Sequence, residues 1–131
     1  MKLPQIGLLI CNSGSSNSGA LTGAAALEVV KELDGEQVGI CSLPALFHEI
    51  PRQVATVRNL KHLIVIDGCR NECAKKVAEK LSLAKDHYLN LEDNLKITKL
   101  GPFSTWSYTL EDVRKVKEAI LERIGQLREK E

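Results

Sequence analysis

Residues 63–73 read LIVIDGCRNEC, and the rest of the chain is best interpreted outward from them. The apolar run LIVI is typical of a buried parallel strand, and residues 74–81 have a helical pattern. We therefore predict that a strand ends here and that a helix runs from about residue 71 to residue 81. The two thiols would then lie at the N-terminus of that helix, and because residues four apart in helical spacing lie on one face, Cys69 and Cys73 would be about 6 Å apart.

The charges predicted around this pair of cysteines favour thiolates. The N-terminal end of a helix carries a partial positive charge, and Arg70, Lys75 and Lys76 add further positive charge nearby. Cys69 and Cys73 are therefore interpreted as half of a functional site.

Strand-like and helix-like segments alternate on both sides of this stretch. The predicted strands are 5–11, 37–41, 61–67, the weaker 87–91 and a short edge piece at 96–100. The predicted helices are 20–33, which stops at residues 34–35, then 52–57 and 71–81. This alternation predicts a single-domain, three-layer α/β/α sandwich with a mainly parallel sheet of four to five strands, in the order 2-1-3-4. Ligands of such sheets bind beyond the carboxyl ends of the strands, near the reversal of strand order.

The last part of the chain has the clearest helix signal. Thr109 can cap the helix together with Asp112, and an apolar stripe follows at helical spacing. The stripe consists of Val113, Val116, Ile120, Ile124 and Leu127. We expect this stripe to cover the sheet, and Trp106 and Tyr108 to fill the outer core.

Composition narrows the class of protein. A chain of 131 residues suits one domain with its own core. The 18 basic and 17 acidic residues give a net charge of +1, which lacks the basic excess of nucleic-acid-binding domains. The apolar runs fall far short of the roughly 20 residues of a membrane span, and no signal peptide is visible, so we expect a cytoplasmic protein without a membrane partner. In a reducing cytosol, four cysteines indicate metal or redox chemistry.

The predicted strand order brings all four cysteines to one edge of the sheet. Cys11, Cys41 and Cys69 each follow a strand, and Cys73 approaches from the helix. Four neighbouring thiolates would repel one another unless they were protonated or bound to a cation, and tetrahedral Zn²⁺ is the usual cation. The leading hypothesis is therefore a small zinc-binding protein with one four-cysteine site.

Two other chemistries use the same residues and stay open. In a thiol-based redox or sulfur-handling enzyme, Cys69 would be the nucleophile and Cys73 would resolve the intermediate. An iron–sulfur cluster also takes four cysteine ligands. The sequence identifies no catalytic residue beyond these thiols.

Three pieces of the chain together carry a family pattern. They are Cys11-x-Ser13-Gly14-x-x-Asn17, then Cys41 after the second strand, then Ile66-Asp67-Gly68-Cys69-x-x-x-Cys73-Ala74-Lys75-Lys76. In order and spacing, over residues 6–81, they resemble the DGC-domain family of zinc-binding proteins. The resemblance implies a metal-binding role for the four cysteines and one DGC-like α/β domain over residues 1–131. It implies no substrate.

The loop 12–19 supports a third hypothesis, an anion- or nucleotide-binding adaptor. A Gly/Ser-rich loop that opens a helix presents backbone N–H groups to a small anion, although a simple turn with a helix cap has the same pattern. Ser13, Gly14 and Asn17 are the candidate binding residues. Ser13 and Asn17 are alternatively donors to the cysteine sulfurs.

Asp67 and Gly68 are the remaining candidate site residues. Asp67 is expected to brace the loop as a helix cap, or else to orient a ligand, and Gly68 to provide a backbone bend. His48, His62 and His87 are expected at the surface or half-buried, with His48 nearest to the site.

Overall fold

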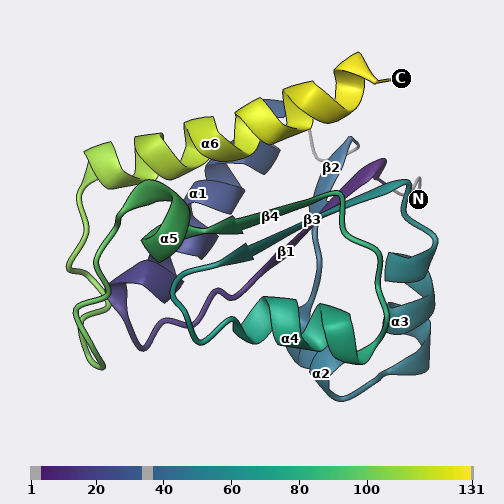
Figure 1. The fold of residues 1–131 in the computed structure, drawn as a ribbon, viewed down its shortest axis with the longest axis horizontal. Coiled ribbons are helices and arrows are strands. Elements are labelled where there is room, and N and C mark those ends of the chain that lie inside the picture. The colour runs from purple at the N-terminus through teal and green to yellow at the C-terminus, as the bar shows by residue number, and fades with distance from the viewer. Residues whose placement is uncertain (1–3, 34–36, 131) are drawn as a thin grey trace.

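The computed structural model describes residues 4–33 and 37–130. Within them, parallel strands form one sheet in the order β2-β1-β3-β4 (Figure 1). The strands are β1 (Ile6–Ile10), β2 (Val38–Ile40), β3 (His62–Asp67) and β4 (His87–Asn90). The predicted fold class and strand order are confirmed. The predicted edge strand at 96–100 is wrong, because this segment is held by a side chain of the first helix and not by the sheet. The predicted helix stop at 34–35 lies outside the described residues.

Helices cover both faces of the sheet. They are α1 (Asn17–Leu33), α2 (Leu43–Phe47), α3 (Pro51–Arg58), α4 (Cys73–Lys80), α5 (Leu91–Leu95) and α6 (Leu110–Glu129). Helices α1 and α6 pack together on one face, and α2, α3 and α4 lie on the other (Figure 1). The result is the predicted three-layer arrangement.

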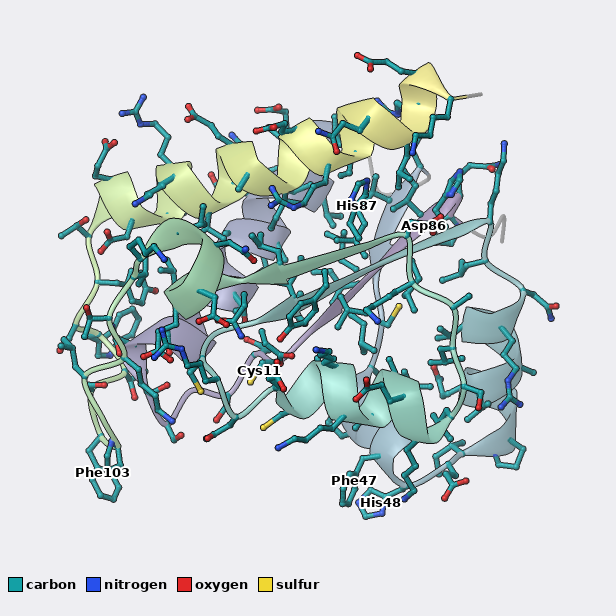
Figure 2. The ribbon with its side chains drawn as sticks, in the orientation of Figure 1. Cys11, Phe47, His48, Asp86, His87 and Phe103 are labelled. Carbon is teal, nitrogen blue, oxygen red and sulfur yellow. The ribbon has the colours of Figure 1, made fainter. Side chains whose placement is uncertain are left out.

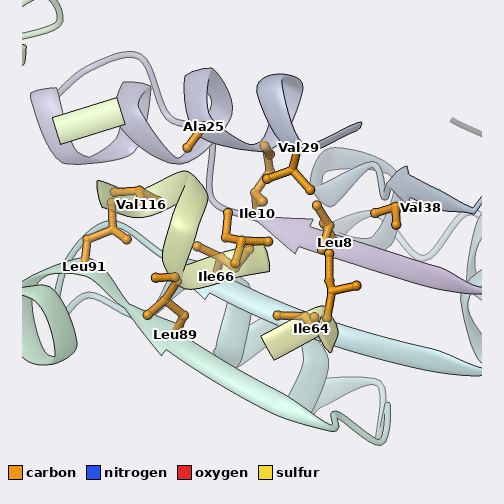
Figure 3. Packing of buried hydrophobic residues seen from close by; sticks show 14 of the residues in the cluster. Leu8, Ile10, Ala25, Val29, Val38, Ile64, Ile66, Leu89, Leu91 and Val116 are labelled. Carbon is orange, nitrogen blue, oxygen red and sulfur yellow. The ribbon is translucent and has the colours of Figure 1, made fainter. Parts of the chain in front are cut away.

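The side chains of the two central strands alternate between two cores. The core under α1 and α6 is shown in Figure 3 and includes Leu8, Ile10, Ile64, Ile66, Val29 and Val116. The core on the opposite face includes Leu9, Leu63, Val65, Val54 and Val77. Strand β1 is buried along its whole length, because it has a helix layer on each side.

Helix α6 begins as the sequence predicts. The Thr109 side chain accepts from the Asp112 N–H, and the Asp112 carboxylate accepts from the Thr109 N–H, which completes a capping box. The predicted stripe faces the core. Tyr108 packs against that core, but Trp106 is 84% exposed, so the prediction that it fills the outer core is wrong.

Helix α4 begins at Cys73, and Cys69 lies in the loop before it. The N-cap residue, Glu72, has φ 57°, a left-handed conformation through which a right-handed helix does not continue. Cys69 and Cys73 therefore do not share a helix face, and the predicted helical spacing between them is wrong.

Candidate functional site

Cys11 and Cys41 follow neighbouring strands, but at different heights on the carboxyl edge of the sheet. Leu8 pairs with Ile40, and the Leu8 carbonyl accepts a hydrogen bond from the Cys41 N–H at 2.9 Å. Cys41 therefore continues the strand two residues short of Cys11. At the rise of a parallel strand this is a difference of roughly 6–7 Å.

The Cys41 side chain turns toward the middle of the sheet. A Cβ on Gly7 would lie 2.9 Å from the Cys41 sulfur and 2.4 Å from Cδ1 of Leu60. The sulfur therefore occupies a niche that only the missing side chain of Gly7 leaves open. Burial raises the pKa of the Cys41 thiol to about 12, so this sulfur is protonated at neutral pH.

Cys11 interacts electrostatically with Cys69 and with Cys73. The pKa of Cys11 is raised, first by burial and then by repulsion from Cys73, Asp67 and Cys69. A backbone hydrogen bond from Ser13 acts in the opposite direction and lowers the pKa of Cys11. Figure 2 shows Cys11 beside the start of α4, the helix that Cys73 begins. These three cysteines share one end of the sheet.

The predicted convergence of all four sulfurs is absent from this conformation. All four cysteines are free thiols, and the described residues hold no group of three or more His, Cys, Asp or Glu side chains arranged to hold a metal ion. For Cys41 the physical reason is strand register, because Cys41 follows β2 below the level of Cys11 and its sulfur rests over Gly7.

Asp67 braces the loop that carries Cys69. Its carboxylate accepts hydrogen bonds from the N–H groups of Ala74 at 2.8 Å and Lys75 at 3.0 Å, which are orphan donors of the first turn of α4. It also accepts from the Tyr88 hydroxyl at 2.9 Å. Asp67 is 1% exposed, so its negative charge is held by the helix N-terminus and these three donors.

Gly68 is required for packing and not for a bend. A Cβ on this residue would come within 2.6–2.8 Å of backbone atoms of Ser18 and Gly19 in the first turn of α1. Gly68 therefore lets the loop after β3 lie directly against the helix after β1. The predicted backbone bend is not its role.

Polar groups of the loop before α1 and of the first residue of α1 bind residues 98–105 and the Cys11 sulfur. The Asn17 amide donates to the Thr98 carbonyl and accepts from the Leu100 N–H, both at 2.9 Å. Ser13 reaches a sulfur through its backbone, as described for Cys11, and the Gly14 carbonyl accepts from the Thr105 hydroxyl. An anion site in this loop stays a prediction.

The Cys69 loop is tied to β4 and α5 on its other side. The Asn90 side chain donates to the Cys69 carbonyl at 2.9 Å, and the Arg70 N–H donates to Glu92 at 3.1 Å. The Arg70 guanidinium pairs with Asp93 at 2.6 Å. The charge of Arg70 is therefore paired with Asp93, and an offset of the sulfurs' charge by Arg70 stays a prediction.

Most of the chain matches the model of one protein family. The model of the DGC domain matches residues 8–120, a span that includes all four cysteines. The chain belongs to the DGC-domain family. Neither a curated protein nor a solved structure matches it. The match extends well past residue 81, where the motifs recognised in the sequence end.

That extension of the DGC domain contains a site residue that the sequence reasoning missed. The Lys99 ammonium lies 3.5 Å from the Cys69 sulfur. Lys99 belongs to the segment predicted as an edge strand, and one lysine among 18 basic residues carries no distinguishing signal.

The histidines of this DGC domain lie apart from the cysteines. His62 Nδ1 is 3.4 Å from Asp86 Oδ1 near the amino ends of the strands, and His87 begins β4. His48 ends α2 and contacts the Phe47 ring. Within residues 4–33 and 37–130, no helix has the length and apolar character that crossing a bilayer requires.

Proposed function

We propose that this DGC domain binds one zinc ion through Cys11, Cys69 and Cys73, with Cys41 as the fourth ligand. The observation that carries the proposal is the placement of Cys11, Cys69 and Cys73 at one end of the sheet, where burial first, and then the charges of Cys73, Asp67 and Cys69, raise the pKa of Cys11. Thiols that repel one another when ionised are brought together by a divalent cation, which removes that repulsion.

The chemistry of the donor set fits zinc. Thiolates select soft and borderline metals such as Zn²⁺ over Mg²⁺ or Ca²⁺. Asp67, whose charge acts on Cys11, is occupied with Ala74, Lys75 and Tyr88 and is not needed as a ligand. The hydrogen bond from Ser13 would orient the Cys11 sulfur and tune it as a ligand.

A shared cavity supports Cys41 as the fourth ligand. Between the ends of β1 and β2 lies a space of about 250 Å³, lined among others by Cys11, Cys41, Ile10 and Pro44. We expect the Cys41 side chain to rotate from its niche over Gly7 toward this space when metal binds. Because Cys41 is protonated until its pKa near 12, binding would release its proton and become stronger as the pH rises.

The zinc ion would stabilise the fold or act as part of a zinc sensor. With four protein sulfurs around it, zinc has no open coordination position for a substrate. It would instead join the loops that follow β1, β2 and β3 to the first turn of α4.

Metal analysis tests this proposal directly. The protein is purified without chelator, and zinc and iron are quantified beside the number of thiols that react before and after metal removal. We expect one zinc per chain and four thiols that become reactive only after removal. Iron with visible absorption would instead indicate an iron–sulfur cluster.

A second candidate function rests on a different observation. Cys73 is exposed at the first residue of α4, and Cys69 contacts an ammonium group, the surroundings of a reactive dithiol. In that case Cys69 attacks a substrate disulfide and releases one substrate thiol. Cys73 then displaces the second thiol, which leaves a Cys69–Cys73 disulfide and a reduced substrate. Metal-free protein with a reversible disulfide between these two residues would favour this candidate over zinc binding.

A further inference from the structure

The exposure of Lys99 and Leu100 is the reverse of what their polarity predicts, because the charged residue is more buried than the apolar one. Leu100 is 59% exposed, whereas Lys99 is half-buried and directs its ammonium to the Cys69 sulfur at 3.5 Å. Lysine normally extends its charged end into water and leucine is normally covered. The backbone here must be held in a way that turns the charged residue inward.

Asn17 holds the backbone on both sides of Lys99. Its side-chain N–H donates to the carbonyl of Thr98, and its side-chain oxygen accepts from the N–H of Leu100, each at 2.9 Å. Asn17 is 3% exposed at the start of α1, a firmly packed position. The two hydrogen bonds fix the peptide groups that flank Lys99, and so fix the direction in which its side chain leaves the chain.

Two of the three cations that the sequence placed near the sulfurs, Arg70 and Lys75, have other partners. Arg70 pairs with Asp93 at 2.6 Å. Lys75 lies 3.5 Å from Glu72 and over the Tyr88 ring, 5.1 Å from its centre. Of Arg70, Lys75 and Lys99, it is Lys99 that contacts a cysteine sulfur.

We propose that Lys99 provides the positive charge that offsets ionised sulfur at this site, and that Asn17 is the residue that positions it. The inference rests on the proposed zinc function. A zinc ion with four thiolates carries a net charge of about −2, and an ammonium at the Cys69 sulfur stabilises that state over the metal-free thiols.

Zinc affinity tests the role of Lys99. It is measured by competition with a chelator for the wild type, Lys99→Met, Lys99→Arg and the control Lys96→Met. Lys96 belongs to the same segment, but its ammonium binds the Asp93 carbonyl. We expect Lys99→Met to bind zinc about tenfold more weakly, as residues that support metal ligands do. Lys99→Arg should recover most of the loss, and Lys96→Met should bind as the wild type does. Equal affinity in Lys99→Met and wild type would overturn the assignment, as would a loss that arginine does not restore.

A double-mutant cycle tests the positioning role of Asn17. Asn17→Ala is made in the wild type and in Lys99→Met, with circular dichroism to verify that each protein is folded. We expect Asn17→Ala to weaken zinc binding when Lys99 is present and to have little further effect when it is replaced. An equal loss in both backgrounds would mean that Asn17 acts only on the fold.

A metal-free measurement keeps the inference testable if the zinc proposal fails. The rate of Cys69 alkylation by anionic iodoacetate is divided by the rate with neutral iodoacetamide at one pH. Trypsin separates Cys69 in peptide 62–70 from Cys73 in peptide 71–75, so mass spectrometry follows each alone. We expect the ratio at Cys69 to fall severalfold in Lys99→Met and to return in Lys99→Arg. An unchanged ratio would show that Lys99 presents no charge at this sulfur, whatever the metal content.

Discussion

The sulfur of Cys41 lies over Gly7, with 2.9 Å between it and the position that a Gly7 Cβ would take. This contact crosses from the end of β2 to the second residue of β1, on the face covered by α2, α3 and α4. It gives Cys41 a resting position away from Cys11. If zinc gathers all four cysteines, this contact must open.

Adding a methyl group to Gly7 should disturb this niche. In Gly7→Ala, the new methyl would lie 2.4 Å from Leu60 Cδ1 as well as close to the Cys41 sulfur. We expect a loss of about 1–3 kcal/mol in the free energy of unfolding, measured in urea, because overpacking forces side chains to move. Cys41 should also react faster with alkylating reagents. Gly14→Ala is the matched control, since nothing lies within 4 Å of a Cβ there. A Gly7→Ala protein as stable as the Gly14→Ala protein would contradict the observed packing.

The cysteines of the metal-free protein should react in a definite order. Cys73 is exposed and should be alkylated first, whereas Cys41 should be last. With a pKa of about 12, only roughly one Cys41 in ten thousand is a thiolate at pH 8. The rate of Cys41 alkylation should rise about tenfold with each pH unit, and this rise should continue well above pH 8 as long as the protein stays folded. Peptide mass spectrometry gives the rates, and similar rates for Cys41 and Cys73 at pH 8 would be inconsistent with this structure.

Removing the Asp67 carboxylate should weaken the start of α4. Asp67→Ala leaves three donors without their acceptor, so we expect a loss of at least about 1–3 kcal/mol in the free energy of unfolding. Tyr88→Phe removes one of these hydrogen bonds and should cost about 0.5–1.5 kcal/mol. Urea titrations of both single variants and the double variant provide the test. Because the two residues are bonded, the double variant should lose less than the sum, and strict additivity would argue against the contact.

His87 should make stability depend on pH. Burial, then the charges of Arg123 and Lys130, lower its pKa below the ordinary value of about 6.5. Above pH 6.5, His87 is neutral in both the folded and the unfolded protein, and its contribution to the free energy of unfolding is fully present. As the pH falls below 6.5, the unfolded chain takes up a proton before the folded one does, so the free energy of unfolding decreases until the lower folded pKa is passed.

Replacing His87 provides the check on this effect. We expect His87→Gln to reduce the slope of melting temperature against pH between 6.5 and 5, while His48→Gln at an exposed position keeps it. An identical slope in His87→Gln and wild type would exclude His87 as the group responsible.

The strand order and the last helix were predictable from short-range signals. The uninterrupted apolar runs of β1 and β3 indicate strands covered on both faces, and the alternation with helices then limits the order of strands. Thr109 and Asp112 lie three residues apart and cap α6 without help from distant parts of the chain. The short helices α2 and α5 were missed. One begins with Pro44 in its first turn, which resembles a break, and the other follows directly on β4.

The details of the site depend on long-range contacts that sequence spacing does not contain. Cys69 was predicted on the helix, but the left-handed Glu72 and the cap from Asp67 start α4 only at Cys73. Cys41 was predicted beside Cys11. The strand order was correct, but the order alone does not determine the register of β1 and β2, and this register places Cys41 two residues below Cys11. Lys99 reaches Cys69 only because Asn17, some 80 residues earlier in the chain, holds its flanking peptides.

X-ray absorption at the zinc edge, on protein purified without chelator, tests the four-sulfur site most directly. We expect zinc in the sample with four sulfur neighbours at about 2.3 Å, and three in Cys41→Ser. Metal-free protein, or zinc surrounded mainly by nitrogen and oxygen, would contradict it.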